Sequence, residues 1–286
     1  MFKYTMVMVL ALSVTLAGRA ESTKDFGDHL PYEFGETVHG FQDDFSGGLS
    51  GDWQWVSQSG RANPFSMATL ADGTPEGRSV LQHTGSVGID NNHLLYMPSV
   101  DYSSTTGAQE VLMRLQVTSL TGYGSNNVYG GAAVAVNPDT SAGVDLHIIK
   151  FLANPNTSAQ RFRVGIGSNL DGGRLESQWT LGSWYWLRLI YDADTDKVYA
   201  KAWLSGTEEP GWDRDGVVYT SLGYTGMTGW AGISANSSGN ITFNVDYFLV
   251  KAEGLPDITV GDFGSIPEPA TMSLLALGGL ALLRRR

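Results

Sequence analysis

The sequence predicts an all-β fold, in which short antiparallel strands pack as a two-sheet sandwich. Apolar and polar residues alternate with a period of two through many short runs, as in half-buried strands. The chain contains 36 glycines, and Gly, Pro, Asn and Asp clusters separate the runs. No long segment with a helical period of 3.6 lies between the two ends. No internal repeat is present, which argues against a propeller or a solenoid.

The strand runs can be placed in order along the chain. Val111–Val117 shows the alternation most simply, because Val111, Met113 and Leu115 alternate with Leu112, Arg114 and Gln116. The clearest hairpin joins two runs through the polar turn Asp192–Asp196. The expected strands are Leu94–Met97, Val111–Val117, Gly130–Val136, Val144–Phe151, Phe162–Ile166, Trp184–Tyr191, Val198–Leu204, Gly229–Ser234 and Ile241–Val250.

The first twenty residues have the composition of a secretory signal peptide. Lys3 precedes an apolar run from Met6 to Leu16, and the small residues Gly18 and Ala20 follow it. This order of charge, apolar run and small residues predicts export and cleavage after Ala20. The apolar run is too short for a permanent membrane span, which needs about 20 residues.

The last twenty residues, 267–286, form a second targeting segment. Pro267, Glu268 and Pro269 precede a 14-residue apolar run, Ala270–Leu283, and the chain ends in three basic residues, Arg284, Arg285 and Arg286. The run is short for a stable span, and the arginines would hold its end on the cytoplasmic side. The segment therefore predicts transient membrane anchoring; a plain C-terminal membrane anchor is the alternative.

Ile266-Pro-Glu-Pro269, the Leu/Ala/Gly run and the Arg cluster together resemble a PEP-CTERM sorting signal. The resemblance implies recognition by an exosortase, a membrane-embedded transpeptidase-like enzyme. It also implies a Gram-negative bacterium that makes exopolysaccharide. The expected destination is the cell surface or the extracellular matrix, after transient anchoring in the inner membrane.

Between the two targeting segments, the expected parts are a leader at 21–39, one domain at 40–252 and a Gly/Pro/Asp-containing spacer at 253–266. Residues 21–266 hold 13 of the 18 basic and 28 of the 29 acidic residues, a net charge of −15. Such a surface repels phosphate backbones, so nucleic acid is not an expected partner. The chain has no cysteine, which excludes disulfides and thiol chemistry.

Six short segments of the domain carry a second resemblance: Phe41–Leu49, Trp184–Leu189, Ala200–Trp203, Glu209–Trp212, Gly229–Ile233 and Val245–Phe248. Together they resemble the concanavalin A-like jelly rolls of the laminin-G and glucanase type. The resemblance implies two curved antiparallel sheets with a concave face, a fold that hosts lectins, carbohydrate-binding modules, glycoside hydrolases and polysaccharide lyases. It therefore does not settle function.

The hairpin predicts a carbohydrate-binding groove. Side chains alternate between the two faces of a strand, so Tyr185, Leu187, Leu189 and Tyr191 share one face with Val198, Ala200 and Ala202 of the partner strand. Aromatic rings stack on sugar rings, and cations donate hydrogen bonds to hydroxyl or carboxylate groups. An acidic polysaccharide is thus a suitable ligand. The groove would be formed by the opposite face: Trp186, Arg188, Tyr199, Lys201 and Trp203. In the alternative interpretation, the indoles of Trp186 and Trp203 pack beneath loops, with Arg188 and Lys201 laid across them.

A structural Ca²⁺ is the second expected ligand. Asp43 and Asp44 lie in the first strand and Asp246 in the last, and these strands are neighbours in the jelly rolls that the chain resembles. Carboxylates and backbone carbonyls at Gly47 or Gly48 would suit Ca²⁺. The alternative is that these acids are ordinary turn and edge residues.

Asp192, Asp194 and Asp196 imitate the start of an EF-hand loop. Lys197 and Trp203 stand where that loop needs Gly and Glu, so the segment is expected to be a hairpin turn.

Catalytic residues are not evident. The Glu-x-Asp-x-x-Glu stretch of the glucanases is absent, and no pair of carboxylates can be placed across a cleft. Glu110 opens a strand, and Glu208 and Glu209 lie in a loop. His83, His93 and His147 are scattered and are expected to be structural, although His147 with Lys150 would also suit a lyase.

These observations predict an exported protein with a non-catalytic carbohydrate-binding domain. The alternatives are a glycoside hydrolase or polysaccharide lyase acting on extracellular polysaccharide, and a structural surface protein without a glycan ligand.

Overall fold

The computed structural model describes residues 22–25, 31–34, 42–71, 78–88, 91–98, 107–121, 127–150, 160–166, 173–218, 225–237 and 239–251. The predicted signal peptide, spacer and sorting segment lie outside these residues. Within the described residues, no helix is long and apolar enough to cross a membrane. In the expected leader, Ser22–Asp25 (β1) pairs with Pro31–Phe34 (β2) in an antiparallel two-stranded sheet.

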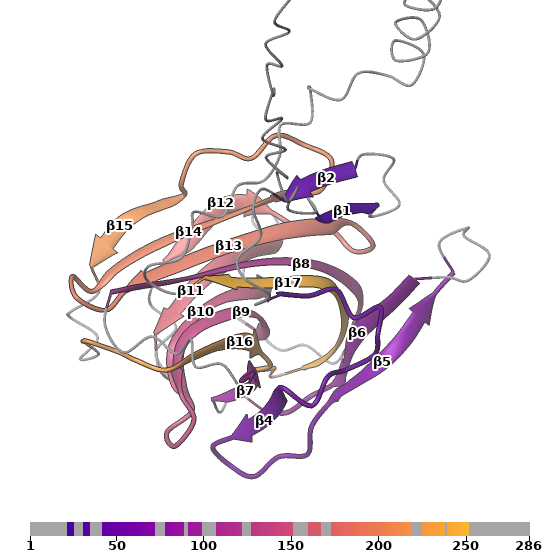
Figure 1. Ribbon diagram of the computed structural model, residues 1–286, viewed down its shortest axis with the longest axis horizontal. Helices are drawn as coiled ribbons and strands as arrows, with labels where there is room; N and C mark the ends of the chain where they lie inside the picture. The colour runs from indigo at the N-terminus through magenta and orange to yellow at the C-terminus, as the bar shows by residue number, and fades with distance from the viewer. Residues whose placement is uncertain are drawn as a thin grey trace, which may run out of the picture.

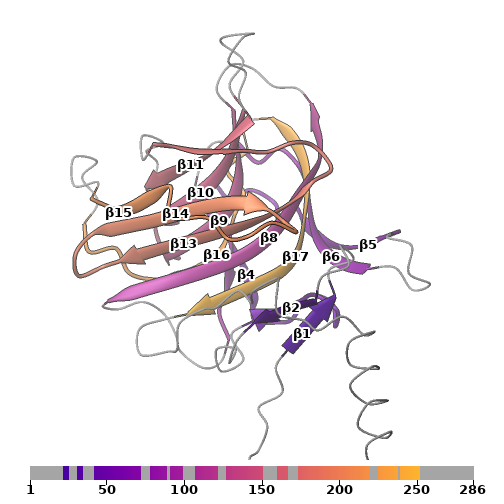
Figure 2. The same cartoon turned by 90° about the horizontal axis from the view of Figure 1, so that it is seen from above.

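Two antiparallel sheets form the domain, which confirms the predicted all-β sandwich (Figures 1 and 2). The seven-stranded sheet runs in the order Arg174–Gln178 (β12), Gln160–Ile166 (β11), Ala142–Lys150 (β10), Asn127–Asn137 (β9), Trp230–Ser234 (β16), Asn92–Tyr96 (β7) and Trp53–Ser57 (β4). Seven strands of the eight-stranded sheet run in the order Arg214–Val218 (β15), Lys197–Leu204 (β14), Trp184–Asp192 (β13), Ala108–Thr121 (β8), Asn240–Lys251 (β17), Arg78–Gly85 (β6) and Phe65–Leu70 (β5), and the eighth is a short strand that also pairs with β17.

The first strand of the domain lies beside the last. Gln42–Asp43 (β3) pairs with β17, so that Asp43 faces Phe248. Trp53 of β4 packs its ring 5.0 Å from that of Phe248 and 4.9 Å from that of Tyr96. These aromatic contacts join the two sheets, because β4 and β7 belong to one sheet and β17 to the other.

The strand β8 departs from its predicted half-buried character. Val111, Met113 and Leu115 are buried in the core as expected, but Leu112 and Arg114 on the opposite face are also fully buried. The outer face of the eight-stranded sheet is thus covered at its centre, and charged side chains there need partners within the protein.

A histidine is stacked inside the core. His83 of β6 lies parallel to the ring of Phe243 at 4.7 Å and edge-on to Phe65 at 5.2 Å. Neither of its ring nitrogens has a hydrogen-bond partner among the described residues. Burial lowers the pKa of His83 to about 4, although the nearby backbone of Ile241 offsets part of this effect. The imidazole is therefore neutral in the folded protein at neutral pH.

The replacement His83→Phe is expected to flatten the loss of stability at mildly acidic pH. The folded-state pKa lies below the unfolded value of 6.5, so the unfolded chain binds the extra proton first as the pH falls. The stability that the neutral His83 contributes is complete above about pH 6.5 and decreases by about 3 kcal/mol as the pH is lowered to 4. Urea unfolding at pH 7.5 and pH 5 measures it. The exposed neighbour Thr84→Ala should retain the wild-type pH dependence, and an equal dependence in His83→Phe would contradict the assignment.

Candidate functional site

The structure brings the five predicted glycan-binding residues together on the outer face of the eight-stranded sheet. In the β13–β14 hairpin, Trp186 faces Trp203, Arg188 faces Lys201, and Ile190 faces Tyr199. The predicted alternation is confirmed, because the opposite set is buried in the core: Tyr185, Leu187, Leu189, Tyr191, Val198, Ala200 and Ala202.

The two indole rings of this group do not form an exposed surface. Trp186 is 0% exposed and Trp203 is 5% exposed, and their rings are stacked with centroids 6.4 Å apart. Tyr247 of β17 lies edge-on to Trp186 at 6.0 Å, and the Arg114 guanidinium lies 5.9 Å from the same ring. A sugar has no free indole face on which to stack here, so the expectation of an open aromatic groove is corrected.

The segment Ser205–Asp213, here called the strap, covers the two cations of the group. The Lys201 ammonium donates a hydrogen bond to the Pro210 carbonyl at 3.1 Å and lies 4.1 Å from the centre of the Trp212 ring. The Arg188 guanidinium lies 5.5 Å from that ring. The hairpin residues thus pack beneath a loop, which is the alternative that the sequence left open.

Two carboxylates neutralise these cations. Arg188 Nε lies 2.5 Å from Glu110 Oε1, and Arg188 Nη1 lies 2.7 Å from Glu209 Oε1. Glu209 also pairs with Lys201. Burial by itself would lower the pKa of Arg188, but the two carboxylates outweigh burial and raise it. The cations are already paired within the protein, so they do not offer the predicted site for an acidic polysaccharide.

Glu110 and Glu209 meet at one guanidinium, although the sequence does not place them together. Hydrolysis of a glycoside needs one carboxylic acid that keeps its proton. Both carboxylates are ion-paired to the same guanidinium, whereas the acid and base of a glycosidase face each other across a cleft that holds the substrate. The arrangement therefore does not provide the acid and base pair of a glycosidase.

The three predicted calcium ligands are held by protein donors. Asp246 accepts hydrogen bonds from Arg78 at 2.8 Å and Arg114 at 2.7 Å. Asp43 accepts from the Phe45 amide and the Trp53 indole, both at 2.7 Å. Asp44 accepts from the amide and hydroxyl of Ser46. Among the described residues, no group of three or more His, Cys, Asp or Glu side chains is arranged to hold a metal ion. The first and last strands are neighbours as expected, but these aspartates are not assembled as a joint site. Calcium binding stays a prediction.

The turn Asp192–Asp196 is a hairpin turn, as predicted. Asp192 accepts hydrogen bonds from the Asp194 amide at 3.0 Å and the Thr195 hydroxyl at 2.5 Å. Asp196 adopts a φ of 55°, and its carboxylate accepts from the Gly226 amide at 2.6 Å and the Tyr191 hydroxyl at 2.7 Å. The carboxylates of Asp192 and Asp196 stabilise the turn and a neighbouring loop.

His93 and His147 lie in a fully buried polar cluster. Asp145 Oδ1 is 2.9 Å from His93 Nε2, and Asp145 Oδ2 is 3.4 Å from His147 Nε2. The same His147 nitrogen is 2.9 Å from the Ser234 hydroxyl. A nucleophile–base–acid relay uses both nitrogens of the imidazole and an accessible nucleophile. Here one nitrogen faces both groups and all four side chains are buried, so the cluster is structural. The side chain of Lys150, proposed as its partner in a lyase, lies outside the described residues.

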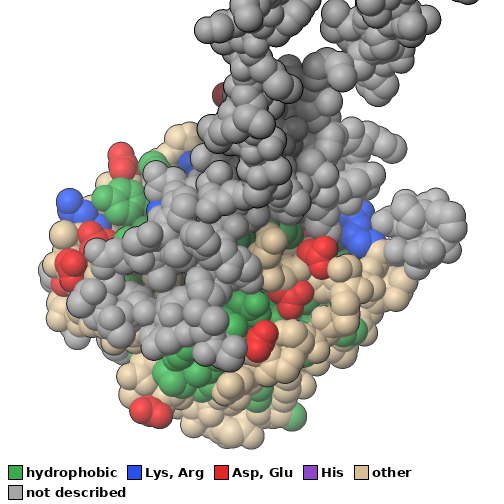
Figure 3. Space-filling view, viewed as in Figure 1, with side chains coloured by type: hydrophobic (Ala, Val, Ile, Leu, Met, Phe, Trp, Pro, Cys, Tyr) green, Lys and Arg blue, Asp and Glu red, His purple; other side chains and the backbone are tan. Residues whose placement is uncertain are grey.

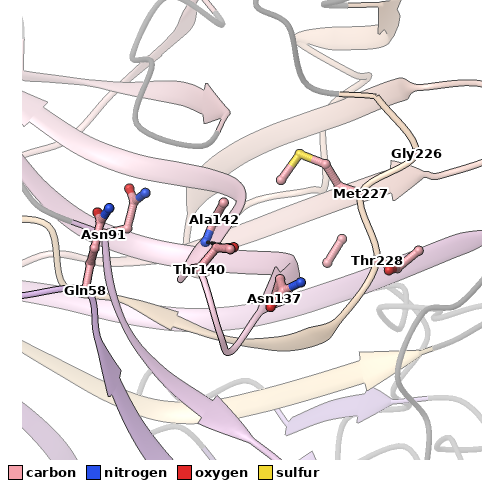
Figure 4. Close-up of a pocket in the computed structure, with 9 residues that line it drawn as sticks. Gln58, Asn91, Asn137, Thr140, Ala142, Gly226, Met227 and Thr228 are labelled. Atoms are coloured by element: carbon pink, nitrogen blue, oxygen red, sulfur yellow. Dashed lines mark hydrogen bonds between the residues drawn. The ribbon is translucent and has the colours of Figure 1, made fainter.

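A pocket of about 410 Å³ lies beside the β9–β10 hairpin (Figure 4). The β9–β10 hairpin supplies Asn137, Thr140 and Ala142 to its wall. Gln58 and Asn91 lie on one side of this hairpin, and Met227 and Thr228 on the other (Figure 4). Gly226 and Ala135 complete the described lining. The size falls within the range of small-ligand sites, and the polar groups are amides and hydroxyls beside one apolar thioether.

Hydrogen bonds to the side chains of Asp196 and Tyr191 hold the loop that carries Met227 in place. The Tyr191 hydroxyl accepts a hydrogen bond from the Met227 amide at 3.0 Å and donates one to Asp196. Burial, followed by the hydrogen bond to Asp196, raises the pKa of Tyr191, so the phenol stays protonated and can donate.

The buried amide of Gln109 joins two walls of the pocket. It accepts from the Ala135 amide at 2.7 Å and donates to the Gly229 carbonyl at 3.3 Å. Gly229 has a φ of 150°, and a Cβ atom there would lie 2.0 Å from the Val136 carbonyl oxygen. Only glycine permits this close approach, so Gly229 lets the loop lie directly against β9.

One family model matches the chain, with residues 265–286 matching the PEP-CTERM protein-sorting motif. The chain carries a PEP-CTERM sorting motif. The motif marks a secreted protein with a C-terminal membrane-anchoring signal that an exosortase processes. No curated protein matches the chain.

Solved structures similar to the chain are concanavalin A-like jelly rolls of lectins and glycoside hydrolases. The cellulose-induced protein Cip1 is 15% identical, with a TM-score of 0.46, over 74% of this chain and 96% of Cip1. Winged bean acidic lectin complexed with methyl-α-D-galactose is 12% identical, with a TM-score of 0.47, over 76% and 98%. A xylan β-1,4-xylosidase from Bacillus halodurans is 16% identical, with a TM-score of 0.44, over 75% of this chain and 39% of the enzyme.

Sequence reasoning did not identify the pocket. Its lining comes from separate segments that meet only in the folded protein: the end of β4, the residue before β7, the β9–β10 hairpin and the loop before β16. Asn, Gln and Thr in these positions look like ordinary turn residues. The Thr-Gly-Met-Thr-Gly run at 225–229 is the one local signal, because it places a Met between two glycines in a loop.

Proposed function

We propose that this protein is exported, sorted by an exosortase to the cell surface or extracellular matrix of a Gram-negative bacterium, and binds an extracellular polysaccharide there without cleaving it. Before processing, the C-terminal segment anchors the chain in the inner membrane. The sorting motif supports the export, and the pocket beside the β9–β10 hairpin supports the binding.

The observation that carries the binding role is the set of hydrogen-bonding groups in the pocket. The side chains of Gln58, Asn91 and Thr228 make no hydrogen bond to another described residue. Asn137 accepts one hydrogen bond from the Asp139 amide through Oδ1, which leaves its amide nitrogen available to a ligand. Sugars present hydroxyl groups that both donate and accept, and side-chain amides match them. Met227 offers an apolar contact for the C–H face of a sugar ring.

The test is the binding of the purified full-length chain to a glycan array, followed by a product assay on every glycan that is retained. Retention with no product is expected. The exposed pocket variant Asn137→Ala is expected to bind about three- to tenfold more weakly, because one hydrogen bond between neutral groups is lost. The control Gln178→Ala, exposed on β12, should bind as the wild type does. An empty array would overturn the proposal, and released product would favour a glycoside hydrolase or lyase.

A further inference from the structure

We infer that the pocket takes a neutral oligosaccharide and discriminates against acidic ones, with Asn91 as the residue that sets this specificity. This inference rests on the proposed function and names the ligand class of the same site. It differs from the expectation of an acidic ligand, which depended on Arg188 and Lys201.

The described lining of the pocket carries no charged side chain. Its polar groups are the amides of Gln58, Asn91 and Asn137 and the hydroxyls of Thr140 and Thr228. An acidic sugar buried among these groups would lose hydration of its carboxylate without gaining a cationic partner. A neutral sugar loses only hydroxyl–water hydrogen bonds, which the amides can replace.

Acidic residues lie near the lining. Asp139 is an exposed residue of the β9–β10 turn, next to the lining residue Thr140. The Asp196 carboxylate accepts from the amide of the lining residue Gly226 at 2.6 Å. Figure 3 shows further acidic side chains on the described surface, and residues 21–266 carry a net charge of −15. Repulsion from these charges adds to the cost of binding an anion.

Asn91 is the most deeply placed amide of the pocket. It is 4% exposed, and its side chain makes no hydrogen bond to another described residue. Its backbone carbonyl accepts from the Gln58 amide at 3.1 Å, which fixes the residue beside the second amide of this wall (Figure 4). The amide therefore keeps its hydrogen-bonding groups available to the pocket, and a ligand hydroxyl that pairs with them is bound selectively.

The test compares neutral and acidic hexasaccharides on the full-length chain by calorimetry. Cellohexaose, xylohexaose and mannohexaose are the neutral probes; hexagalacturonate and hexamannuronate are the acidic ones. The wild type is expected to bind at least one neutral probe tenfold or more tightly than any acidic probe. Asn91→Ala should weaken that binding about tenfold, and so should Asn91→Asp, which keeps the shape but removes the donor. Near-UV circular dichroism checks folding, and the exposed variant Gln58→Ala tests the same wall if Asn91 variants fail to fold.

A gain-of-binding variant completes the design. Thr228→Lys places a cation at the exposed rim and is expected to improve binding of the acidic probes several-fold, with the gain lost at high salt. Preferential binding of acidic probes by the wild type, weakened in Asn137→Ala, would overturn the neutral specificity and leave glycan binding intact. Binding that no pocket variant changes would overturn the site. Binding of no probe, together with an empty array, would overturn both proposals.

Discussion

Replacing Asp246 with alanine is expected to lower the free energy of unfolding by about 3–5 kcal/mol, because it leaves a buried charge without compensation. Asp246 is fully buried and accepts hydrogen bonds from Arg78 and Arg114. Arg114 is also fully buried, with its guanidinium 4.7 Å from the Trp184 ring. Denaturant unfolding monitored by tryptophan fluorescence measures the change.

The double variant Asp246→Ala/Arg114→Met separates the lost charge from the lost packing. It removes both buried charges and is expected to recover part of the stability that Asp246→Ala loses. Arg114 Nε also donates to the Ser205 hydroxyl at 3.0 Å, so the strap begins at this network. The exposed Asp194→Ala is the control and should change stability by less than 1 kcal/mol. A comparably small effect at Asp246 would contradict the assigned role.

The second large effect is expected for Asp145→Asn, which should cost about 3–5 kcal/mol at pH 7. Burial alone would raise the pKa of Asp145, but His93 and His147 outweigh it and lower the pKa. A carboxylate with a depressed folded-state pKa stabilises the protein above the unfolded value of about 3.9 and loses this contribution as the pH falls through the folded value.

The pH dependence identifies the carboxylate as the source of that effect. The wild type is expected to lose stability steeply below about pH 4, while Asp145→Asn lacks this component. Urea unfolding at pH 7 and pH 3 compares them. The difference between the two proteins should shrink at pH 3; a constant difference would show that Asn disturbs packing rather than charge.

The sequence predicts a strand correctly where only one face of the strand packs against the core, because apolar and polar residues then alternate along it. In β13 and β14 the core set alternates strictly, so the hairpin, its turn and its faces follow from the sequence. The sequence does not predict β4 and β5, because apolar and polar residues do not alternate over the full length of Trp53–Ser57 and Phe65–Leu70. The alternation in β8 predicts a half-buried strand, and its local pattern does not show that the outer face is buried as well.

The candidate sites could not be predicted fully from the sequence, because they too depend on contacts between distant segments. The proximity of Trp186 and Trp203 follows from the hairpin that the sequence predicts, whereas their burial depends on contacts with distant segments. Glu110 and Glu209 reach the same arginine from β8 and from the strap. Asn91 and Met227 belong to segments that only the tertiary fold brings to one pocket. The spacing of residues along the chain does not show which distant segments come into contact in the folded protein.

The central position of β17 has a consequence for the order of events in export. This last strand pairs with β8 on one side and with β6 and β3 on the other. A chain synthesised only as far as β16 therefore has two exposed strand edges where the eight-stranded sheet should be continuous. Closure of the domain must await residue 251, so the emerging chain stays open and suited to threading through a secretion channel. It completes its folding once nearly the whole domain has been released on the far side of the membrane.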